Sequence, residues 1–447
     1  MTSLLWKDLI VSSTQISREL GFPTKIYFKK ENDLNPHQKN LYYVGLRNWG
    51  LTQVRVGRFC KKRPPEQLMA ILSISFGMIE QKRYTNFTIV NQSVEAAKKL
   101  HGKRFASLLN FILRDILKDQ NAAMHDKNNH VAKWNVPNWW LEKMKTQFKL
   151  QTNRILNVNR YHPPLSLRVS HSYKDMKNLK RDLENENTKV IQIGEKTLNI
   201  IPPYDIRITQ SFKKGIISVQ DYSSQKIIDF IKPEKNTFLL DACAAPGGKT
   251  FALASRYSSI NIVSSDISKK RIQKLNKDLI RQKNYLLSTP KIVVADICRN
   301  PCREKLLSMT KKGFDYVILD APCSGSGVVR RHPEIPWNRS IKQIKNLVSL
   351  QSNLLKNAWD LLKLDGILLY SVCSIFKEEG EIQIRNFLNA KQDSTLIESI
   401  LLEPKLGPES YKSSNLTDYE KNYLGYDGFY YGVLKKQVDK KFKFLKS

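Results

Sequence analysis

Long apolar runs are missing from this 447-residue sequence. A membrane-spanning helix needs roughly 18 or more uninterrupted apolar residues, and no segment reaches that length. The opening stretch, MTSLLWKDLIVSSTQ, places Lys7 and Asp8 where a signal peptide needs an apolar centre. We therefore expect a cytoplasmic protein that does not associate with a membrane.

Cysteine is scarce and follows no framework spacing. Small secreted domains carry closely spaced cysteines for disulfide bonds, whereas these cysteines are scattered through a long chain. Cys298 and Cys302 lie close together, but no second pair or nearby histidine completes a zinc site. The sequence thus favours a reducing compartment and predicts no metal site. The six cysteines are Cys60, Cys243, Cys298, Cys302, Cys323 and Cys373.

Acidic residues are too few to balance the basic ones. The chain has 74 Lys and Arg against 41 Asp and Glu, which gives a formal charge of +33. Such an excess attracts polyanions, of which nucleic acid is the usual one. An AT-rich coding bias toward Lys, Asn and Ile is the alternative source of the excess. We predict a nucleic-acid partner, because phosphate binding needs only part of the excess.

The chain is too long for one ordinary domain, and its first part is predicted to be helical. In Lys103–Asp119, apolar residues recur at helical spacing along one face. In Pro64–Arg83, two prolines suited to a helix start precede a strongly apolar run. We therefore predict an all-helical domain over residues 1–140.

A small mixed α/β segment is predicted over residues 141–231. A Pro-Pro turn leads into a short strand at Leu165–Val169, and the stretch MKNLKRDLENEN that follows has a helical composition. KVIQIG, further along, has the composition of a strand.

From residue 232 the pattern changes to repeated strand–helix units. This alternation predicts a parallel sheet with helices on both faces, a Rossmann-like α/β domain over residues 232–438. DGFYYGVLKK is compatible with a late hairpin that closes the sheet, and residues 439–447 form a basic tail. The predicted strands are TFLLD, INIVSSD, KIVVAD, FDYVILD and GILLYSVC.

The loop DACAAPGGKT, after the first of these strands, ends like a phosphate-binding P-loop but lacks one of its glycines. The P-loop pattern needs glycine where this chain has Cys243, so the tight turn around a phosphate loses its first hinge. The fingerprint G-x-G-x-x-G of dinucleotide-binding proteins is also absent. Ala244, Ala245, Gly247 and Gly248 still let the backbone approach a ligand closely. The loop therefore suits an adenosine cofactor without a phosphate chain, such as S-adenosylmethionine.

Four acidic residues are predicted at strand ends: Asp241, Asp266, Asp296 and Asp320. Ligands bind at the carboxyl ends of the strands in such a sheet, so four acids there indicate a polar ligand. The alternative is that each acid only caps the following helix. In a ligand site, Asp266 would receive ribose hydroxyls and Asp296 an adenine amino group.

Two predicted neighbouring strands each deliver a cysteine to the same edge, Cys323 after the fourth strand and Cys373 after the fifth. A single cysteine at such a place is usually a small buried apolar residue. Two of them among Ser, Pro and Gly favour reactive thiols. Addition of a thiolate to carbon 6 of cytosine activates carbon 5 for methylation, and Asp320 could stabilise the adduct near ring nitrogen 3.

A thiol must lose its proton before it can attack, and nearby positive charge favours that loss. The candidate cations are Lys249, Arg330 and Arg331.

Three motifs together resemble the RNA cytosine-5 methyltransferase family, the Nop2/Sun/Fmu group: DACAAPGGKT, LDAPCSGSGVVRRHPEIPW and YSVCSIFKEEGE. FKKGIISVQDYSSQ is similar to the family's motif ahead of the first strand. RPPEQLMAILSISFGMIEQKRY resembles the NusB-like domain of the bacterial branch that methylates small-subunit ribosomal RNA.

The resemblance implies a class I methyltransferase domain behind a NusB-like RNA-binding domain and a small connecting segment. It implies that Cys373 is the nucleophile and that Cys323 assists product release. With Asp320 and the candidate cation Lys249, these residues form the predicted catalytic set. It implies S-adenosylmethionine as the cofactor. The implied cofactor-binding residues are Cys243, Ala244, Ala245, Pro246, Gly247, Gly248, Lys249, Asp266, Asp296 and Asp320.

One residue departs from the family pattern. Val372 stands before the nucleophile where the family usually has Thr, and the missing hydroxyl removes one local hydrogen bond worth about 1 kcal/mol.

The target base must be unpaired or flipped to expose carbons 5 and 6. The candidate phosphate contacts are Arg55–Arg63 and Lys177–Asp182, each of which could equally be a solvated helix face. Trp139 and Trp140 could stack on bases, although core packing is the alternative that we favour.

The predicted function is methyl transfer to carbon 5 of one cytosine of 16S ribosomal RNA through a covalent cysteine adduct. The expected substrate is free or partly assembled RNA, and the protein is expected to act as a monomer. The alternative is an RNA-binding ribosome-assembly factor with a vestigial methyltransferase site.

Overall fold

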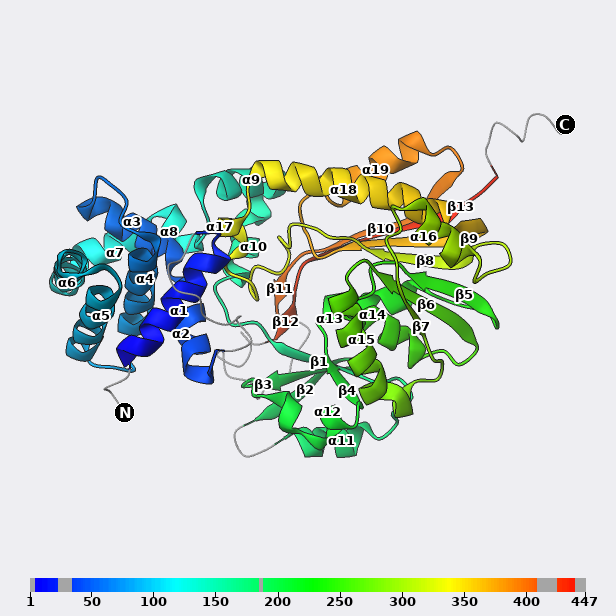
Figure 1. The fold of residues 1–447 in the computed structure, drawn as a ribbon, viewed down its shortest axis with the longest axis horizontal. Coiled ribbons are helices and arrows are strands. Elements are labelled where there is room, and N and C mark those ends of the chain that lie inside the picture. Colours follow the sequence, from blue (N-terminus) through cyan, green and yellow to red (C-terminus); the bar gives the residue numbers. More distant parts are fainter. Residues whose placement is uncertain (1–4, 23–33, 185–187, 408–423, 439–447) are drawn as a thin grey trace. The chain divides into compact units, whose positions relative to one another are not determined.

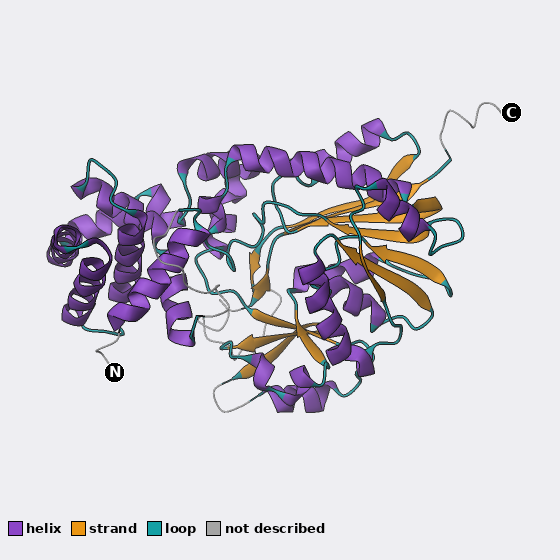
Figure 2. Ribbon diagram, viewed as in Figure 1, coloured by secondary structure: helices purple, strands orange, loops and turns teal. Residues whose placement is uncertain are grey.

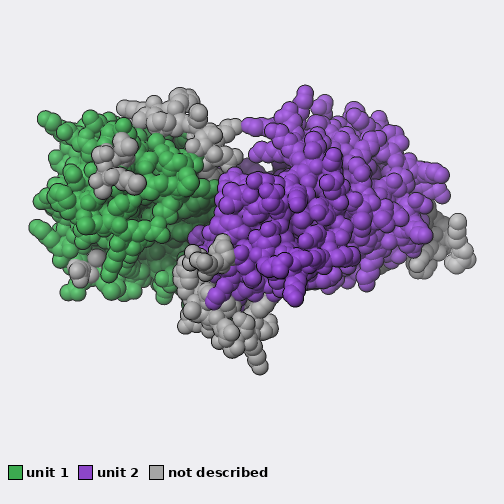
Figure 3. Space-filling view, turned by 90° about the horizontal axis from the view of Figure 1, so that it is seen from below, with its two compact units in different colours: residues 1–160, 329–340 green, residues 161–328, 341–447 purple. Residues whose placement is uncertain are grey.

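The chain divides into two compact units (Figure 3). The computed structural model describes residues 5–22, 34–184, 188–407 and 424–438. Unit 1 comprises Met1–Arg160 and Val329–Ser340, and unit 2 comprises Tyr161–Val328 and Ile341–Ser447. The predicted basic tail, residues 439–447, lies outside the described residues.

Unit 1 contains helices and no strand in its described residues (Figure 2), which confirms the helical prediction for the first part of the chain. Its helices are α1 (Leu5–Glu19), α2 (Pro36–Arg47), α3 (Trp49–Phe59), α4 (Glu66–Gln81), α5 (Asn86–His101), α6 (Lys103–Lys118), α7 (Gln120–Asn128), α8 (His130–Trp134), α9 (Asn138–Phe148), α10 (Thr152–Val158) and α17 (Ile335–Asn338).

Helix α4 forms the centre of unit 1. It is buried on all sides from Gln67 to Met78, because α1, α2 and α5 pack around it. A helix that is apolar all round has no face to offer to solvent, and burial is the arrangement that its sequence predicts. Helix α6 instead presents only one apolar stripe to the core, including Leu109 and Leu113.

The predicted phosphate contact at Arg55 is wrong. Its side chain lies in the core of unit 1, only 1% exposed, with the guanidinium 4.7 Å from the centre of the Phe76 ring. Arg58 bonds to Asp126 at 2.6 Å. Lys61 remains exposed and could still meet a phosphate.

A short segment that follows the Cys323 motif in the sequence belongs to unit 1 rather than unit 2. Within it, Trp337 packs against the unit 1 core, and its indole N–H donates to the carbonyl of Asn135 at 3.0 Å. The amide of Asn338 donates to the carbonyl of Glu19 at 3.3 Å. The chain therefore leaves unit 2, anchors itself in unit 1 and returns.

The first part of unit 2 is a four-stranded antiparallel sheet in the order β2-β3-β1-β4. Leu179 and Leu183 of one helix pack on this sheet against Leu167 and Ile200. This part confirms the predicted strand at Leu165–Val169. Its elements are β1 (Leu165–Val169), α11 (Met176–Leu183), β2 (Lys189–Gly194), β3 (Thr197–Ile201), α12 (Gln210–Lys213) and β4 (Ile217–Val219).

The rest of unit 2 is built on a seven-stranded sheet in the order β10-β13-β9-β8-β5-β6-β7. The strands from β5 to β9 are parallel, and β13 and β10 extend the sheet as an antiparallel edge. The strands are β5 (Thr237–Asp241), β6 (Ile260–Asp266), β7 (Lys291–Val294), β8 (Phe314–Asp320), β9 (Leu362–Val372), β10 (Ser394–Leu402) and β13 (Phe429–Lys436); a separate pair is β11 (Lys405–Leu406) and β12 (Gly425–Tyr426).

Helices cover both faces of the large sheet (Figure 1). Leu240 packs with α18 and α19 on one face, whereas Leu239 packs with α14 on the other. Successive side chains of a strand point to opposite faces, so a sheet covered on both sides needs continuous apolar strands. The helices of this part are α13 (Tyr222–Gln225), α14 (Gly248–Ala254), α15 (Lys269–Gln282), α16 (Asn300–Leu307), α18 (Ile341–Asp360) and α19 (Glu381–Ala390).

The strand order reverses at β5. The chain runs from β5 outward to β6 and β7, then crosses to β8 and β9 on the other side of β5. Such a reversal opens a crevice at the carboxyl ends of the strands, and ligands of open α/β sheets bind there. The loops that follow β5 and β8 flank this point.

No helix among the described residues is long and apolar enough to cross a membrane.

Candidate active site

Two thiols face each other at the carboxyl edge of the large sheet. Cys323 follows β8 and Cys373 follows β9, and 3.3 Å separates their sulfur atoms. Both cysteines are free and partly buried. The peptide N–H of Gly327 donates to the carbonyl of Cys373 at 3.1 Å, so the first loop folds back over the end of β9. The parallel pairing of β8 with β9 confirms that the two strands are neighbours.

The Cys323 thiol is held in its protonated form. A hydrogen bond to Cys373 and burial raise the pKa of Cys323 well above its ordinary value, and the charge of Glu379 acts in the same direction. A thiol with a raised pKa is a poor nucleophile and keeps its proton at neutral pH. Cys323 therefore suits the role of a proton-holding partner beside the other sulfur.

One buried carboxylate joins the two cysteine loops. Glu379 is completely enclosed and accepts hydrogen bonds from the Ser374 hydroxyl at 2.5 Å and the Ser324 hydroxyl at 2.5 Å. The peptide N–H of Ser324 also donates to it at 2.7 Å, and the Gln351 amide of α18 donates at 3.1 Å. Ser324 and Ser374 directly follow the two cysteines, so Glu379 fixes one loop relative to the other.

The sequence analysis assigned no role to Glu379. The signal was present, because a serine follows each cysteine and the acidic stretch KEEGE comes shortly after Cys373. Two adjacent glutamates occur in that stretch, however, and sequence alone does not say which one turns inward. In the structure the Tyr370 hydroxyl also donates to the Glu379 carbonyl at 2.6 Å, which anchors the backbone of the buried residue.

Asp320, the last residue of β8, is paired with Lys249, the second residue of α14. Their charged atoms lie 2.5 Å apart, and Lys249 is only 6% exposed whereas the Asp320 side chain is 36% exposed. The Ser371 hydroxyl donates to the second oxygen of Asp320 at 2.8 Å. The ammonium of Lys249 also lies 5.4 Å from the centre of the Phe429 ring. Asp320 is thus oriented by two donors while one side remains open.

The loop Cys243–Gly248 is shaped by its own backbone. The N–H of Ala244 donates to the carbonyl of Ser265 at 2.9 Å, and the N–H of Gly247 donates to the carbonyl of Ala244 at 2.7 Å. Gly247 has a φ of +106°, and a β-carbon there would come within 2.5 Å of the Phe251 ring. Glycine is therefore required at this position for two reasons. Pro246 is exposed at the tip of the loop.

Asp266 and Asp296 both accept hydrogen bonds from the turns that follow their strands. Asp266, the last residue of β6, accepts from the N–H of Ser268 at 2.9 Å and pairs with Arg271 at 3.2 Å. Asp296 lies two residues beyond β7, so it does not end the strand as predicted, and it accepts from the N–H of Cys298 at 2.9 Å. Neither acid caps the following helix, because the N-cap residues of α15 and α16 are Ser268 and Arg299. Asp266 also accepts from the N–H of Ala245, in the loop after β5, at 3.3 Å.

Asp241 is an interior residue rather than part of an open ligand surface. It is fully buried, and its Oδ2 accepts a hydrogen bond from the Thr250 hydroxyl at 2.7 Å. Its Oδ1 has no hydrogen-bond partner among the described residues. Burial raises the pKa of Asp241 from 3.8 to about 6.

Replacing Asp241 by Asn is expected to remove part of the pH dependence of stability. Because the folded-state pKa lies above the unfolded one, wild-type stability relative to Asp241→Asn is greatest below about pH 4 and falls as the pH rises through 6. The fall should be about 3 kcal/mol at most. Urea unfolding of both proteins between pH 4 and 7 measures it, and parallel profiles would contradict the shifted pKa.

Three further residues were singled out in the sequence. Arg330 belongs to unit 1, where it is buried and its carbonyl accepts a hydrogen bond from Arg47 at 2.9 Å. Arg331 belongs to the same unit. Val372 is completely buried in the apolar cluster under α18. Among the described residues, no group of three or more His, Cys, Asp or Glu side chains could hold a metal ion.

Two solved structures share this fold. The crystal structure of PH0851 superposes with a TM-score of 0.73 at 24% identity, covering 96% of this chain and 99% of that chain. The crystal structure of NSun6 from Pyrococcus horikoshii with SFG, an S-adenosylmethionine analogue, superposes with a TM-score of 0.55 at 20% identity, covering 68% and 99%. At these identities the likeness establishes the fold, which is the Rossmann-like methyltransferase fold.

Sequence comparison identifies the family. Residues 228–435 match the family described as 16S rRNA methyltransferase RsmB/F, and residues 136–207 match its ferredoxin-like domain. Ribosomal RNA small subunit methyltransferase B of Vibrio cholerae is 32% identical over 351 residues, which cover 78% of this chain and 76% of the relative. The chain belongs to the RsmB/F family of 16S rRNA methyltransferases.

Proposed function

We propose that this protein transfers a methyl group from S-adenosylmethionine to carbon 5 of a cytosine in 16S ribosomal RNA through a covalent adduct with Cys373. The observation that carries the proposal is the pair of sulfur atoms 3.3 Å apart at the ends of adjacent strands, beside an oriented carboxylate. Simple methylation of an exposed oxygen or nitrogen would need neither thiol.

The first step forms a bond between Cys373 and the base. The thiolate sulfur adds to carbon 6, and the electron pair of the 5,6 double bond makes carbon 5 nucleophilic. The electrons that move toward ring nitrogen 3 are stabilised there by a proton that the Lys249–Asp320 pair donates through Asp320. The same proton returns to the pair when the ring is restored. Bound S-adenosylmethionine would supply the methyl group as an electrophile.

The second half of the reaction restores the aromatic ring. Carbon 5 now carries both a methyl group and a hydrogen, and a base must take that hydrogen as a proton. The electron pair of the broken C–H bond re-forms the double bond, and the bond from carbon 6 to Cys373 breaks, which returns the thiolate. We assign assistance in this release to Cys323, the only other thiol within contact of Cys373 among the described residues.

The residues of the crevice fit S-adenosylmethionine better than a nucleoside triphosphate. The strand-end acids offer oxygen acceptors, which suit the hydroxyl and amino groups of an adenosine cofactor and repel phosphates. Lys249, which a P-loop protein would use on phosphates, is already paired with Asp320 at 2.5 Å. The cofactor-contacting set is proposed as Cys243–Lys249 with Asp266, Asp296 and Asp320.

Unit 1 is proposed as a NusB-like RNA-binding domain, with the four-stranded sheet as a connecting segment that also meets RNA. The helical composition of unit 1, the charge of +33 and the ribosomal RNA family support this assignment. The proposed substrate is free or partly assembled 16S RNA, met by a monomer in the cytoplasm. The boundaries at residues 140 and 231 stay predictions.

Bisulfite mapping of 16S ribosomal RNA tests the proposal. RNA from cells with the gene should contain one cytosine that resists conversion, and RNA from cells without it should have that cytosine converted. Reintroducing the wild-type gene should restore the resistance, whereas a Cys373→Ala gene should not.

Purified protein gives an independent readout of the cofactor. S-adenosylmethionine, and not ATP, should raise its unfolding temperature. Stabilisation by ATP alone, or methylation of another atom of the RNA, would contradict the proposal. Cofactor binding without any methylation would favour the assembly factor with a vestigial site.

A further inference from the structure

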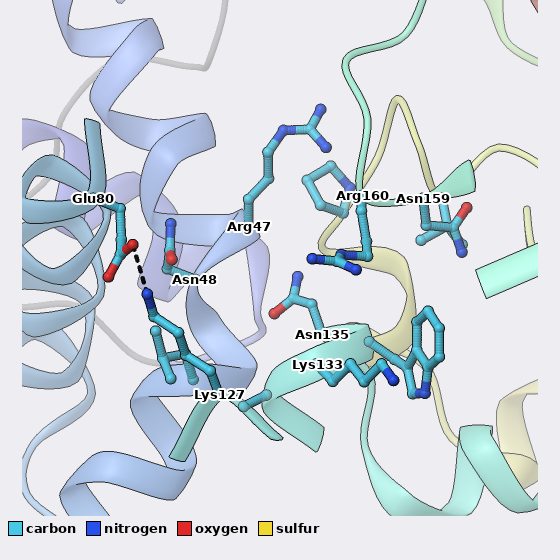
Figure 4. Close-up of a pocket in the computed structure, with 13 residues that line it drawn as sticks. Arg47, Asn48, Glu80, Lys127, Lys133, Asn135, Asn159 and Arg160 are labelled. Carbon is cyan, nitrogen blue, oxygen red and sulfur yellow. Dashed lines mark hydrogen bonds and ion pairs between the residues drawn. The ribbon is translucent and has the colours of Figure 1, made fainter. Parts of the chain in front are cut away.

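A cavity of about 290 Å³ lies entirely within unit 1, and basic side chains dominate its charged lining (Figure 4). We call it the Arg47 pocket. Its side chains come from α2, α3, α4, α7 and α8, from the turn after α10 and from the segment after the Cys323 motif. The charged lining residues are Arg47, Glu80, Lys127, Lys133 and Arg160.

Only one cation of the pocket is neutralised by the lining acid. Lys127 pairs with Glu80 at 2.8 Å, which satisfies the acid (Figure 4). Lys133 lies over the Trp134 ring, 4.9 Å from its centre, and is exposed. Arg160 is also exposed, and Figure 4 shows its guanidinium directed toward Asn135. The pocket therefore carries an excess of positive charge on its open side.

Arg47 contributes a donor without a partner. Its Nη2 donates to the carbonyl of Arg330 at 2.9 Å, but its Nη1 is shielded from solvent and has no hydrogen-bond partner in the described part of the chain. Burial lowers the pKa of Arg47, while the charges of Tyr43 and Glu334 oppose that shift only in part. An arginine remains protonated even so, and a buried N–H without an acceptor costs free energy that an anion would recover.

The uncharged wall of the pocket is held in place before any ligand arrives. Asn135 adopts a left-handed conformation with φ of +52°, accepts from the N–H of Gly50 at 2.7 Å and donates to the carbonyl of Leu46 at 2.9 Å. Trp337 donates to the carbonyl of the same residue at 3.0 Å. A β-carbon at position 50 would come within 2.3 Å of the Val131 carbonyl, so only glycine allows this approach.

We propose that the Arg47 pocket binds a phosphodiester group of the RNA backbone. The inference rests on the proposed function, because it takes its RNA from there. Guanidinium groups bind phosphate oxygens through their N–H donors, and the cavity offers the exposed guanidinium of Arg160 together with the one unpartnered donor of Arg47. A contact of this kind reads no base and instead sets the position of the RNA.

The sequence connects this pocket to the catalytic loop. Val329 and Pro333 line the pocket, and the chain reaches them directly after the loop that carries Cys323. The same segment therefore continues from the catalytic loop and forms one wall of the pocket in unit 1. The ligand is the RNA backbone rather than free phosphate, because the chain carries a charge of +33 and its family acts on ribosomal RNA.

The test compares two pairs of exposed basic residues in unit 1. The pocket variant is Arg160→Gln with Lys133→Gln, and the control is Arg114→Gln with Lys118→Gln on α6, which removes the same charge outside the pocket. RNA affinity is measured over a range of salt concentrations for each protein. The pocket variant should bind 16S RNA about tenfold more weakly near 0.1 M salt and lower the salt slope by about 1. The control should change affinity less than about twofold.

Two results would overturn the inference. One is an equal loss of affinity in the pocket variant and the control, which would mean that only net charge counts. The other comes from a phosphate arm, in which inorganic phosphate stabilises wild-type protein but not the pocket variant while both bind RNA alike. That outcome would make the pocket a free-phosphate site.

Two controls keep a failure of the inference apart from a failure of the proposed function. Wild-type protein must methylate RNA with S-adenosylmethionine, and S-adenosylmethionine must raise the unfolding temperature of the pocket variant as it does for wild type. If wild type is active and both variants bind RNA equally, only the Arg47 pocket loses its role.

Discussion

Replacing Cys323 by alanine is expected to leave the protein covalently attached to its RNA. Cys373 can still attack carbon 6 and carbon 5 can still be methylated, but the partner that assists release is gone. The adduct should survive denaturation and appear on a denaturing gel as a band that requires both labelled RNA and S-adenosylmethionine. Cys373→Ala should form no such band and should lower kcat by roughly 10⁴-fold or more.

Two further variants make this result specific. Cys302→Ala removes a partly buried thiol of α16 and should behave as wild type. The double variant Cys323→Ala with Cys373→Ala should form no adduct, because the attacking sulfur is absent. An adduct in Cys373→Ala but not in Cys323→Ala would exchange the two roles, and full activity of Cys373→Ala would end the covalent mechanism.

Replacing Glu379 by glutamine is expected to slow adduct formation about 100-fold with little change in RNA affinity. The amide cannot accept all four hydrogen bonds that the carboxylate receives from Ser324, Ser374 and Gln351. The two cysteine loops then lose their common anchor, and a misplacement near 1 Å can cost about 10²-fold in rate. Single-turnover kinetics in the Cys323→Ala background measures the step directly.

The matched control is Glu381→Gln, an exposed acid at the start of α19. It should leave both the rate and the unfolding temperature unchanged. Glu379→Ala is expected to destabilise the fold by several kcal/mol, about 1–3 kcal/mol for each donor left unpaired, and serves only to report stability. If Glu379→Gln unfolds at a lower temperature yet forms the adduct at the wild-type rate, Glu379 has a structural role alone.

The sequence was sufficient to predict those features of the fold and site that depend on local chemistry. A continuous apolar run such as Val317–Leu319 is buried on both faces, and alternation with helices makes the strands from β5 to β9 parallel. Parallel strands bring their carboxyl ends to one edge, so Cys323 and Cys373 had to meet there once β8 and β9 were neighbours. The sequence singled out Gly247 only for close backbone approach, and its left-handed φ of +106° is a finding of the structure.

Burial and pairing of charged groups were decided by the tertiary structure. Sequence treated Glu378 and Glu379 alike, yet only Glu379 turns inward to bridge two loops whose serines are far apart along the chain. From the sequence alone, Lys249 was compatible with binding a phosphate. In the structure it is paired with Asp320, at the end of β8.

Arg55 is another charged residue whose burial was decided by the tertiary structure. Its sequence neighbours suggested a surface that meets phosphates, whereas packing of α3 against α4 and α7 encloses it. Periodicity along the chain tells which residues share a face. The burial and pairing of a single charged side chain depend on groups that other elements place beside it. The packing of the whole unit determines which groups those are.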